Sequence, residues 1–159
     1  MAYAENTTVP LEKSIGDIVA LVKKAGAERI ARFEEPDRFT VQFELGGRMV
    51  RFRVRLPQPD EFTKRGARPA NDAEQRQSAE SRARQRARAL LLVIKAKLES
   101  VESEVETFEE AFLPNIVMSD GATVYERVAE PIALEYRDPT PRPLLLSGPS
   151  APSDGGVSR

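Results

Sequence analysis

A run of apolar residues at helical spacing, between about Asp72 and Phe112, constrains the fold more than any other stretch of the chain. The residues recur in alternating steps of four and three, which is the spacing of a seam along one side of a helix. They are Ala87, Leu91, Ile94, Leu98, Val101, Val105, Phe108 and Phe112. We therefore predict one long amphipathic helix that packs lengthwise against a partner.

The charges of this predicted helix are separated along its length. Seven bases and three acids lie between Asp72 and Leu98, a net charge of +4, whereas Glu99 to Glu110 holds six acids and no base, a net charge of −6. The helix dipole favours the opposite order by about 0.3–1 kcal/mol for each end charge. One interpretation is a solvated charged face. The other is that the two ends contact oppositely charged groups.

The middle of the helix is apolar on all sides, because Leu90, Leu92 and Val93 lie off the seam. A second surface has to cover these side chains, and a single three-stranded sheet covers only one side of a helix. We therefore expect a homo-oligomer. The expected subunit interface consists of Leu90, Leu91, Ile94 and Leu98.

The first half of the chain predicts a short helix followed by three strands. After a flexible lead over residues 1–9, Ser14 and Asp17 have the spacing of a capping box, and the helix is expected to end near Gly26. The apolar period then changes to two, as in strands. The predicted strands cover about 29–33, 39–45 and 49–56.

The turn between the second and third strands sets their register. Gly46-Gly47 suits a two-residue hairpin turn, so Gln42 is expected opposite Arg51, with one apolar face and one polar face. The first strand leaves two alternatives. A three-residue loop near Pro36 places Phe33 inside, whereas a two-residue loop places it outside.

The polar face of this sheet is rich in arginine. The hairpin register places Thr40 opposite Arg53 and Arg38 opposite Arg55, and opposed like charges destabilise a sheet. Either this face is solvated or contacts acids from elsewhere, such as those at 99–110, or it binds phosphates.

The remaining segments complete a predicted α+β domain over residues 10–137: a helix, a three-stranded antiparallel sheet, a long amphipathic helix and a short C-terminal helix. Residues 57–71 are expected to form a mobile basic loop. Pro114 should end the long helix, and 115–118 has the pattern of a short strand. A capping box at Thr123 and Glu126 predicts the last helix, and 138–159 is expected to be a disordered tail rich in Pro, Ser and Gly.

Composition excludes several kinds of chemistry. The chain has no histidine and no cysteine, which removes the usual general base, the Ser and Cys triads and the common zinc sites. We expect no catalytic residue, metal or cofactor. No apolar run approaches the roughly 20 residues of a membrane span, and the first ten residues lack a signal-peptide pattern. We therefore expect a cytoplasmic protein that does not insert into membranes.

Two stretches carry a resemblance to known proteins: RQRARALLLVIKAKLESVES at 84–103 and FEEAFLPNIVMSDGATV at 108–124. They resemble small proteins of unassigned function that are encoded by tailed phages and prophages. The resemblance covers about 15–143 and implies an accessory protein acting in the cytoplasm of a bacterial host. The predicted element order is similar, at the level of topology only, to the core of Rad52-like single-strand annealing proteins.

Together these features predict a non-enzymatic, oligomeric protein that binds single-stranded DNA in phage recombination, annealing or replication. It would contact the phosphate backbone without reading sequence. The residues expected to hold phosphates are Arg51, Arg53, Arg55, Arg82, Arg84, Arg86, Arg88, Lys95 and Lys97. The alternative is a protein-interaction module that binds or inhibits a host protein through its acidic stretch.

Overall fold

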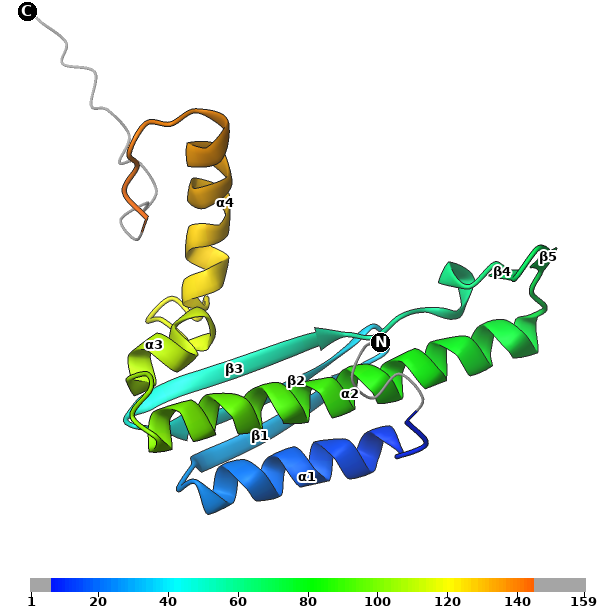
Figure 1. Ribbon diagram of the computed structural model, residues 1–159, viewed down its shortest axis with the longest axis horizontal. Coiled ribbons are helices and arrows are strands. Elements are labelled where there is room, and N and C mark those ends of the chain that lie inside the picture. Colours follow the sequence, from blue (N-terminus) through cyan, green and yellow to red (C-terminus); the bar gives the residue numbers. More distant parts are fainter. Residues whose placement is uncertain (1–6, 145–159) are drawn as a thin grey trace, which may run out of the picture.

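The structure is a computed structural model that describes residues 7–144 (Figure 1). Its main elements are α1 (Leu11–Lys24), β1 (Glu28–Glu35), β2 (Arg38–Leu45), β3 (Arg48–Arg55), α2 (Asp72–Glu102), α3 (Phe108–Phe112) and α4 (Val124–Arg137). The sheet is antiparallel with the order β1-β2-β3. The predicted α+β class is confirmed. Residues 145–159 of the predicted tail, and 1–6 of the predicted lead, lie outside the described residues.

The β2–β3 hairpin has the predicted register. Gln42 pairs with Arg51, and Arg38 pairs with Arg55. The turn between the strands uses Gly46 at φ 60° and Gly47 at φ 70°, a left-handed conformation that glycine adopts without a steric penalty.

The β1–β2 connection is a two-residue turn, which decides between the alternatives for Phe33. Glu35 pairs with Arg38, and Phe33 therefore lies opposite Thr40 on the outer face of the sheet. Its side chain is 53% exposed. At the other end of β1 the register shifts between Glu28 and Ala31.

The core lies between the inner face of the sheet and a layer of two helices, α1 and α2, which lie side by side (Figure 1). Leu90 and Ile94 of α2 are 8% and 0% exposed within this core. The same cluster takes in Ile15, Ile18, Val22, Phe39, Val41, Phe43, Val50, Phe52, Ala87, Ala111 and Phe112. Helix α1 is therefore a second surface that covers α2.

This packing corrects the predicted subunit interface. Leu90 and Ile94 are buried inside one chain, and the partly buried Leu91 and Leu98 pack against the same core. Leu90 and Ile94 therefore present no apolar surface to another subunit, and Leu91 and Leu98 present only part of theirs. The apolar side chains of this stretch that remain exposed are Leu92 and Val93, at 40% and 45%.

The predicted helix over 72–112 is interrupted, which is a second correction. Helix α2 ends at Glu102. Glu104 then adopts φ 56°, its N–H bonds the carbonyl of Val101 at 3.2 Å, and the N–H of Val105 bonds the carbonyl of Ser100 at 2.9 Å. These two hydrogen bonds form a Schellman motif, which ends helices. Val105 is consequently 75% exposed rather than part of the seam.

The chain returns to the core after this turn. Thr107 and Glu110 form a capping box that starts α3. The rings of Phe108 and Phe112 stack with their centroids 4.9 Å apart, and Phe112 is fully buried. The seam therefore continues in space although the helix does not.

The start of α1 also differs from the prediction. The helix begins at Leu11, directly after Pro10, and not at a cap formed by Ser14. Ser14 is a buried residue of the helix interior, and its Oγ has no hydrogen-bond partner among the described residues. Pro10 is the N-cap residue, with φ −58° and ψ 148°, and no side chain caps the first turn.

The segment at 57–71 forms local structure where the sequence predicted a mobile loop. It contains a 3₁₀ turn at Pro59–Glu61 and a small hairpin of β4 (Lys64–Arg65) and β5 (Arg68–Pro69). The hairpin lies beside the N-terminal half of α2 (Figure 1).

The connection from α3 to α4 follows the prediction in part. Pro114 lies in a 3₁₀ turn at Leu113–Asn115 directly after α3. The predicted short strand is reduced to two isolated bridges, Val50 with Ile116 and Val117 with Thr123.

Candidate nucleic-acid interface

The nine residues predicted to bind phosphates do not form one surface. Arg51 and Arg53 lie on the outer face of the sheet, opposite Gln42 and Thr40. The α2 bases lie on the other side of the sheet, because α2 packs on its inner face. Arg55, at the end of β3, meets α2 at one point, where its carbonyl oxygen accepts a 2.6 Å hydrogen bond from Nη1 of Arg86.

Most of the arginines on the sheet face are neutralised by other parts of the chain. Nη1 of Arg53 lies 2.6 Å from Oε1 of Glu126, and Nη2 of Arg55 lies 2.5 Å from Oε1 of Glu61. Arg51 donates to Oε1 of Gln42 at 2.9 Å and to the carbonyl of Gly121 at 2.8 Å. The outer face of the sheet thus contacts acids from α4 and the 3₁₀ turn, whereas the stretch at 99–110 reaches the sheet at the hairpin end, where Oε1 of Glu109 lies 3.8 Å from Nη2 of Arg48.

Ion pairs also explain how the sheet tolerates Arg38 and Arg55 opposite each other. Arg38 binds Asp37, with Nη2 and Oδ2 2.8 Å apart, and Arg55 binds Glu61. The hydrogen bond from Arg55 is the main reason that the pKa of Glu61 lies below its usual value. Each arginine therefore has its own carboxylate, which offsets the repulsion across the strands.

Two bases of α2 hold the fold together. Nη1 of Arg88 lies 3.0 Å from Oδ2 of Asp17 and joins α2 to α1. The ammonium of Lys97 donates to the carbonyl of Ala111 and lies 5.8 Å from the centre of the Phe112 ring. Both side chains are partly buried, and these contacts within the chain account for the positions of the two charged groups without a ligand.

The other α2 bases have no carboxylate partner among the described residues, although Arg86 donates to the carbonyl of Arg55. Among residues 7–144, no carboxylate oxygen lies within 4.0 Å of the charged groups of Arg82, Arg84, Arg86 or Lys95, or of the neighbouring Arg76. Arg82 donates only to Oε1 of Gln85, at 2.7 Å. The Nε atom of Arg84 is buried and has no acceptor within this part of the chain.

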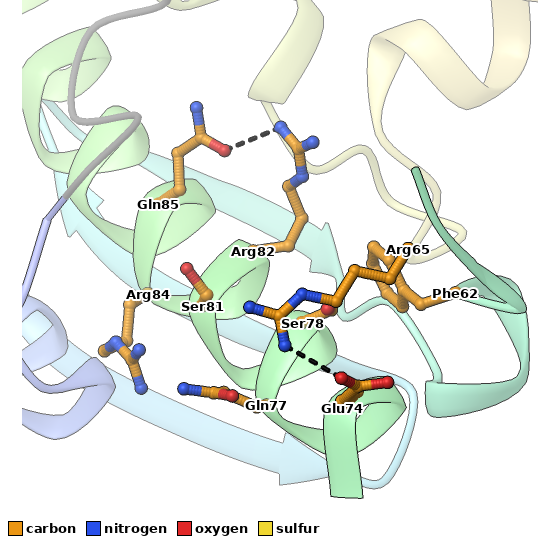
Figure 2. A pocket seen from close by; sticks show the side chains of 9 residues that line it. All are labelled: Phe62, Arg65, Glu74, Gln77, Ser78, Ser81, Arg82, Arg84 and Gln85. Atoms are coloured by element: carbon orange, nitrogen blue, oxygen red, sulfur yellow. Dashed lines mark hydrogen bonds and ion pairs between the residues drawn. The ribbon is translucent and has the colours of Figure 1, made fainter. Parts of the chain in front are cut away.

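A groove runs between the N-terminal half of α2 and the segment that precedes it (Figure 2). Its volume is about 450 Å³. Phe62 and Arg65 come from the preceding segment and face the α2 side chains. The lining residues are Phe62, Arg65, Glu74, Gln77, Ser78, Ser81, Arg82, Arg84 and Gln85.

The one carboxylate in this groove is already bound. Oε1 of Glu74 lies 2.6 Å from Nη2 of Arg68 and 2.9 Å from Nη1 of Arg65. Arg68, the backbone N–H of Asn71 and Arg65 together lower the pKa of Glu74 to about 2. Glu74 also caps α2 together with Asn71, so it fixes the β4–β5 hairpin against the helix.

A second hollow of about 560 Å³ continues the groove along α2. Phe62, Arg82 and Gln85 line both hollows and form the ridge between them. The second hollow adds Arg86 and Ala89 from α2 and Glu61 from the 3₁₀ turn. The two hollows together make a track that follows the basic half of the helix.

Phe62, Arg65, Ser78 and Ser81 were missed as site residues by the sequence analysis. One signal could have found part of this set. Asn71 and Glu74 have capping-box spacing, and recognising it would have placed the arginines of 57–71 at the N-terminus of α2.

The arrangement is chemically suited to binding anions. Guanidinium groups and hydroxyls donate hydrogen bonds to phosphate oxygens, and an aromatic ring can stack on a base. Within residues 7–144, no group of three or more acidic side chains is placed to hold a metal ion.

None of the helices in the described part of the chain has the length and apolar character needed to cross a membrane. Comparisons of the chain with protein-family models, with curated proteins and with solved structures found no match.

Proposed function

We propose that this protein is a non-enzymatic nucleic-acid-binding protein that holds a single strand along the groove between α2 and the β4–β5 hairpin. The observation that carries the proposal is the set of Arg82, Arg84 and Arg86. They lie within about one and a half turns of α2, and none of them has a carboxylate partner among residues 7–144. Backbone phosphates would supply the missing negative charge.

The site favours backbone contacts with one stacked base. Arginine and serine side chains bind phosphates regardless of base identity. Phe62, on the ridge between the two hollows, offers a ring on which an unpaired base can stack, worth about 1–3 kcal/mol. Bases inside a duplex are stacked on each other, so the proposed ligand is single-stranded. The proposal assigns the protein a role in phage recombination, annealing or replication.

The test is the salt dependence of binding to a fluorescent single-stranded oligonucleotide, measured by anisotropy. Replacing Arg82 and Arg84 with Gln should weaken binding and flatten the slope of log affinity against log salt, by about 0.7 for each phosphate that the protein no longer neutralises. The preference among base sequences should not change. The double substitution should weaken binding to all oligonucleotides alike.

The matched control is the pair Lys23→Gln and Lys24→Gln. It also removes two positive charges, but from the exposed C-terminal end of α1, near the acidic end of α2 and far from the groove (Figure 1). An equal loss in both double variants would show that net charge alone governs binding. The proposal would be contradicted if the wild-type protein did not raise the anisotropy of the oligonucleotide at low salt.

A second candidate function rests on the opposite end of α2. Glu102 and Glu104 are exposed and have no base within 4.0 Å among the described residues. They fit a surface that recognises a basic region of a host protein. If this function is the correct one, the variant Glu102→Gln with Glu104→Gln should lose a purified protein partner that the wild type binds, while the Arg82 and Arg84 variant keeps it.

A further inference from the structure

Arg55 is the residue through which the sheet reaches the second hollow of the groove. Its guanidinium binds the carboxylate of Glu61 with two hydrogen bonds: Nη2 lies 2.5 Å from Oε1, and Nη1 lies 3.1 Å from Oε2. Its backbone carbonyl accepts a 2.6 Å hydrogen bond from Nη1 of Arg86. Glu61 lines the hollow from the 3₁₀ turn and Arg86 lines it from α2. Arg55 therefore contacts both walls, although it is not itself a lining residue.

Glu61 is the acid placed to neutralise Arg86. Among the described residues that line the second hollow, Glu61 is the only acidic one. The pKa of Glu61 is lowered first by Arg55 and then by the backbone N–H of Gln58, and the charge of Arg86 also contributes. The two charges therefore attract each other across the hollow. Even so, no carboxylate oxygen in residues 7–144 lies within 4.0 Å of the charged group of Arg86.

The contacts of Glu61 explain why it leaves Arg86 unpaired. Both carboxylate oxygens bind Arg55, and Oε1 also accepts the backbone N–H of Gln58 at 2.7 Å. A two-bond contact between a guanidinium and a carboxylate fixes the direction of both groups. The side chains of Arg55 and Glu61 are 60% and 35% exposed, so this pair contributes little to global stability. Its main effect is to hold the carboxylate in place.

We propose that Arg55 is a positioning residue of the groove, which holds the carboxylate of Glu61 and thereby keeps Arg86 free to bind a phosphate. The inference rests on the proposed function, because a free Arg86 matters only if an anion binds there. It gives Arg55 a different role from the direct phosphate contact that the sequence predicted. When Arg55 is replaced, Glu61 pairs with Arg86, and the strand loses one contact although no lining residue has changed.

The first test needs no nucleic acid. Chemical denaturation at low salt, where ion pairs are screened least, measures the coupling between Glu61→Gln and Arg86→Gln as a double-mutant cycle. The cycle is measured in the wild type and again in the Arg55→Gln background. The coupling should be larger in the Arg55→Gln background, because the new ion pair then joins the two residues. Equal coupling in both backgrounds would overturn the proposal.

The second test is the salt dependence of binding to a fluorescent single-stranded oligonucleotide. Arg55→Gln should flatten the slope of log affinity against log salt by about 0.7, the value for one phosphate. Arg86→Gln should have the same effect, and the two substitutions together should flatten the slope no further. Adding Glu61→Gln to Arg55→Gln should restore the wild-type slope, because no carboxylate is then left to pair with Arg86.

Arg38→Gln is the matched control for Arg55→Gln. It removes the same charge from the residue directly opposite Arg55 in the sheet, but the partner of Arg38 is Asp37. The slope should therefore stay at the wild-type value. Equal flattening by Arg38→Gln and Arg55→Gln would overturn the proposal by showing that net charge alone governs binding.

Other outcomes of the binding test would also overturn the proposal. An unchanged slope in Arg55→Gln would show that Glu61 does not reach Arg86. Further flattening in the Arg55 and Arg86 double variant would show that Arg55 itself contacts a phosphate. A wild type that binds no oligonucleotide would overturn the proposed function, whereas the denaturation cycle would still show whether Arg55 controls the pairing of Glu61. Circular dichroism establishes that the variants are folded.

Discussion

The carboxylate of Glu126 joins α4 to the guanidinium of Arg53 on the sheet, with Oε1 and Nη1 2.6 Å apart. The same side chain caps its own helix, because Oε2 accepts the backbone N–H of Thr123 at 2.7 Å. That backbone hydrogen bond is the first cause of the lowered pKa of Glu126, and Arg53 also contributes. One residue therefore starts α4 and attaches it to the sheet.

Separating these two roles gives the first prediction. Glu126→Ala removes the cap and the ion pair, and we expect it to lower the free energy of unfolding by about 1 kcal/mol or more. Glu126→Gln keeps an oxygen that can accept the Thr123 N–H, and should cost less. Chemical denaturation measures both. Glu130→Ala, an exposed position of the same helix, is the control and should change little. Equal losses in the Ala and Gln variants would show that the ion pair dominates.

The second prediction concerns acid and the β4–β5 hairpin. Folding lowers the pKa of Glu74 from 4.5 to about 2, so the folded protein holds this carboxylate charged more readily than the unfolded chain. The stabilisation is fully present above pH 4.5 and is lost as the pH falls towards 2. Glu74→Gln should therefore be less stable than the wild type near neutral pH, and the difference should shrink across this window. A difference independent of pH would show that the carboxylate charge does not stabilise the hairpin.

Replacing Glu104 provides the third prediction. Its φ of 56° places an L side chain in the left-handed region, which costs roughly 1–2 kcal/mol relative to the right-handed helical conformation. Glycine has no such penalty and is the preferred residue at this position of a Schellman motif. We expect Glu104→Gly to raise the melting temperature and the free energy of unfolding, the latter by about 1 kcal/mol. Glu102→Gly, at the last residue of α2, should instead destabilise the protein.

The fourth prediction tests the place of Ile94 in the core. The side chain is fully buried, and Ile94→Ala should lower the free energy of unfolding by about 2–5 kcal/mol because it leaves a cavity. Val105→Ala removes apolar atoms from a side chain that is 75% exposed, and should change stability by no more than about 0.5 kcal/mol. A small effect of Ile94→Ala in a folded monomer would mean that Ile94 is buried by association between subunits instead.

Local patterns in the sequence determined much of the fold. Gly46-Gly47 predicted the hairpin register because a two-residue turn decides which residues face each other. Thr123 and Glu126 predicted the start of α4 because a capping box involves only residues three apart. The seam from Ala87 to Val101 predicted the buried side of α2. Each of these predictions depends on neighbours in the chain, and the sequence contains that information directly.

Other features were decided by tertiary structure alone. The seam showed that α2 has a buried side, but only the packing showed that Leu90 is buried in the core of one chain rather than by a second subunit. The helical spacing of the apolar residues also continues past Ser103 in the sequence. In the structure, a turn with Glu104 in the left-handed region ends α2 there and lets Phe112 reach the core. Arg53 and Arg82 look alike in the sequence. Of the two, only Arg53 has a carboxylate within reach among residues 7–144, because ion pairing depends on distance in space and not on spacing along the chain.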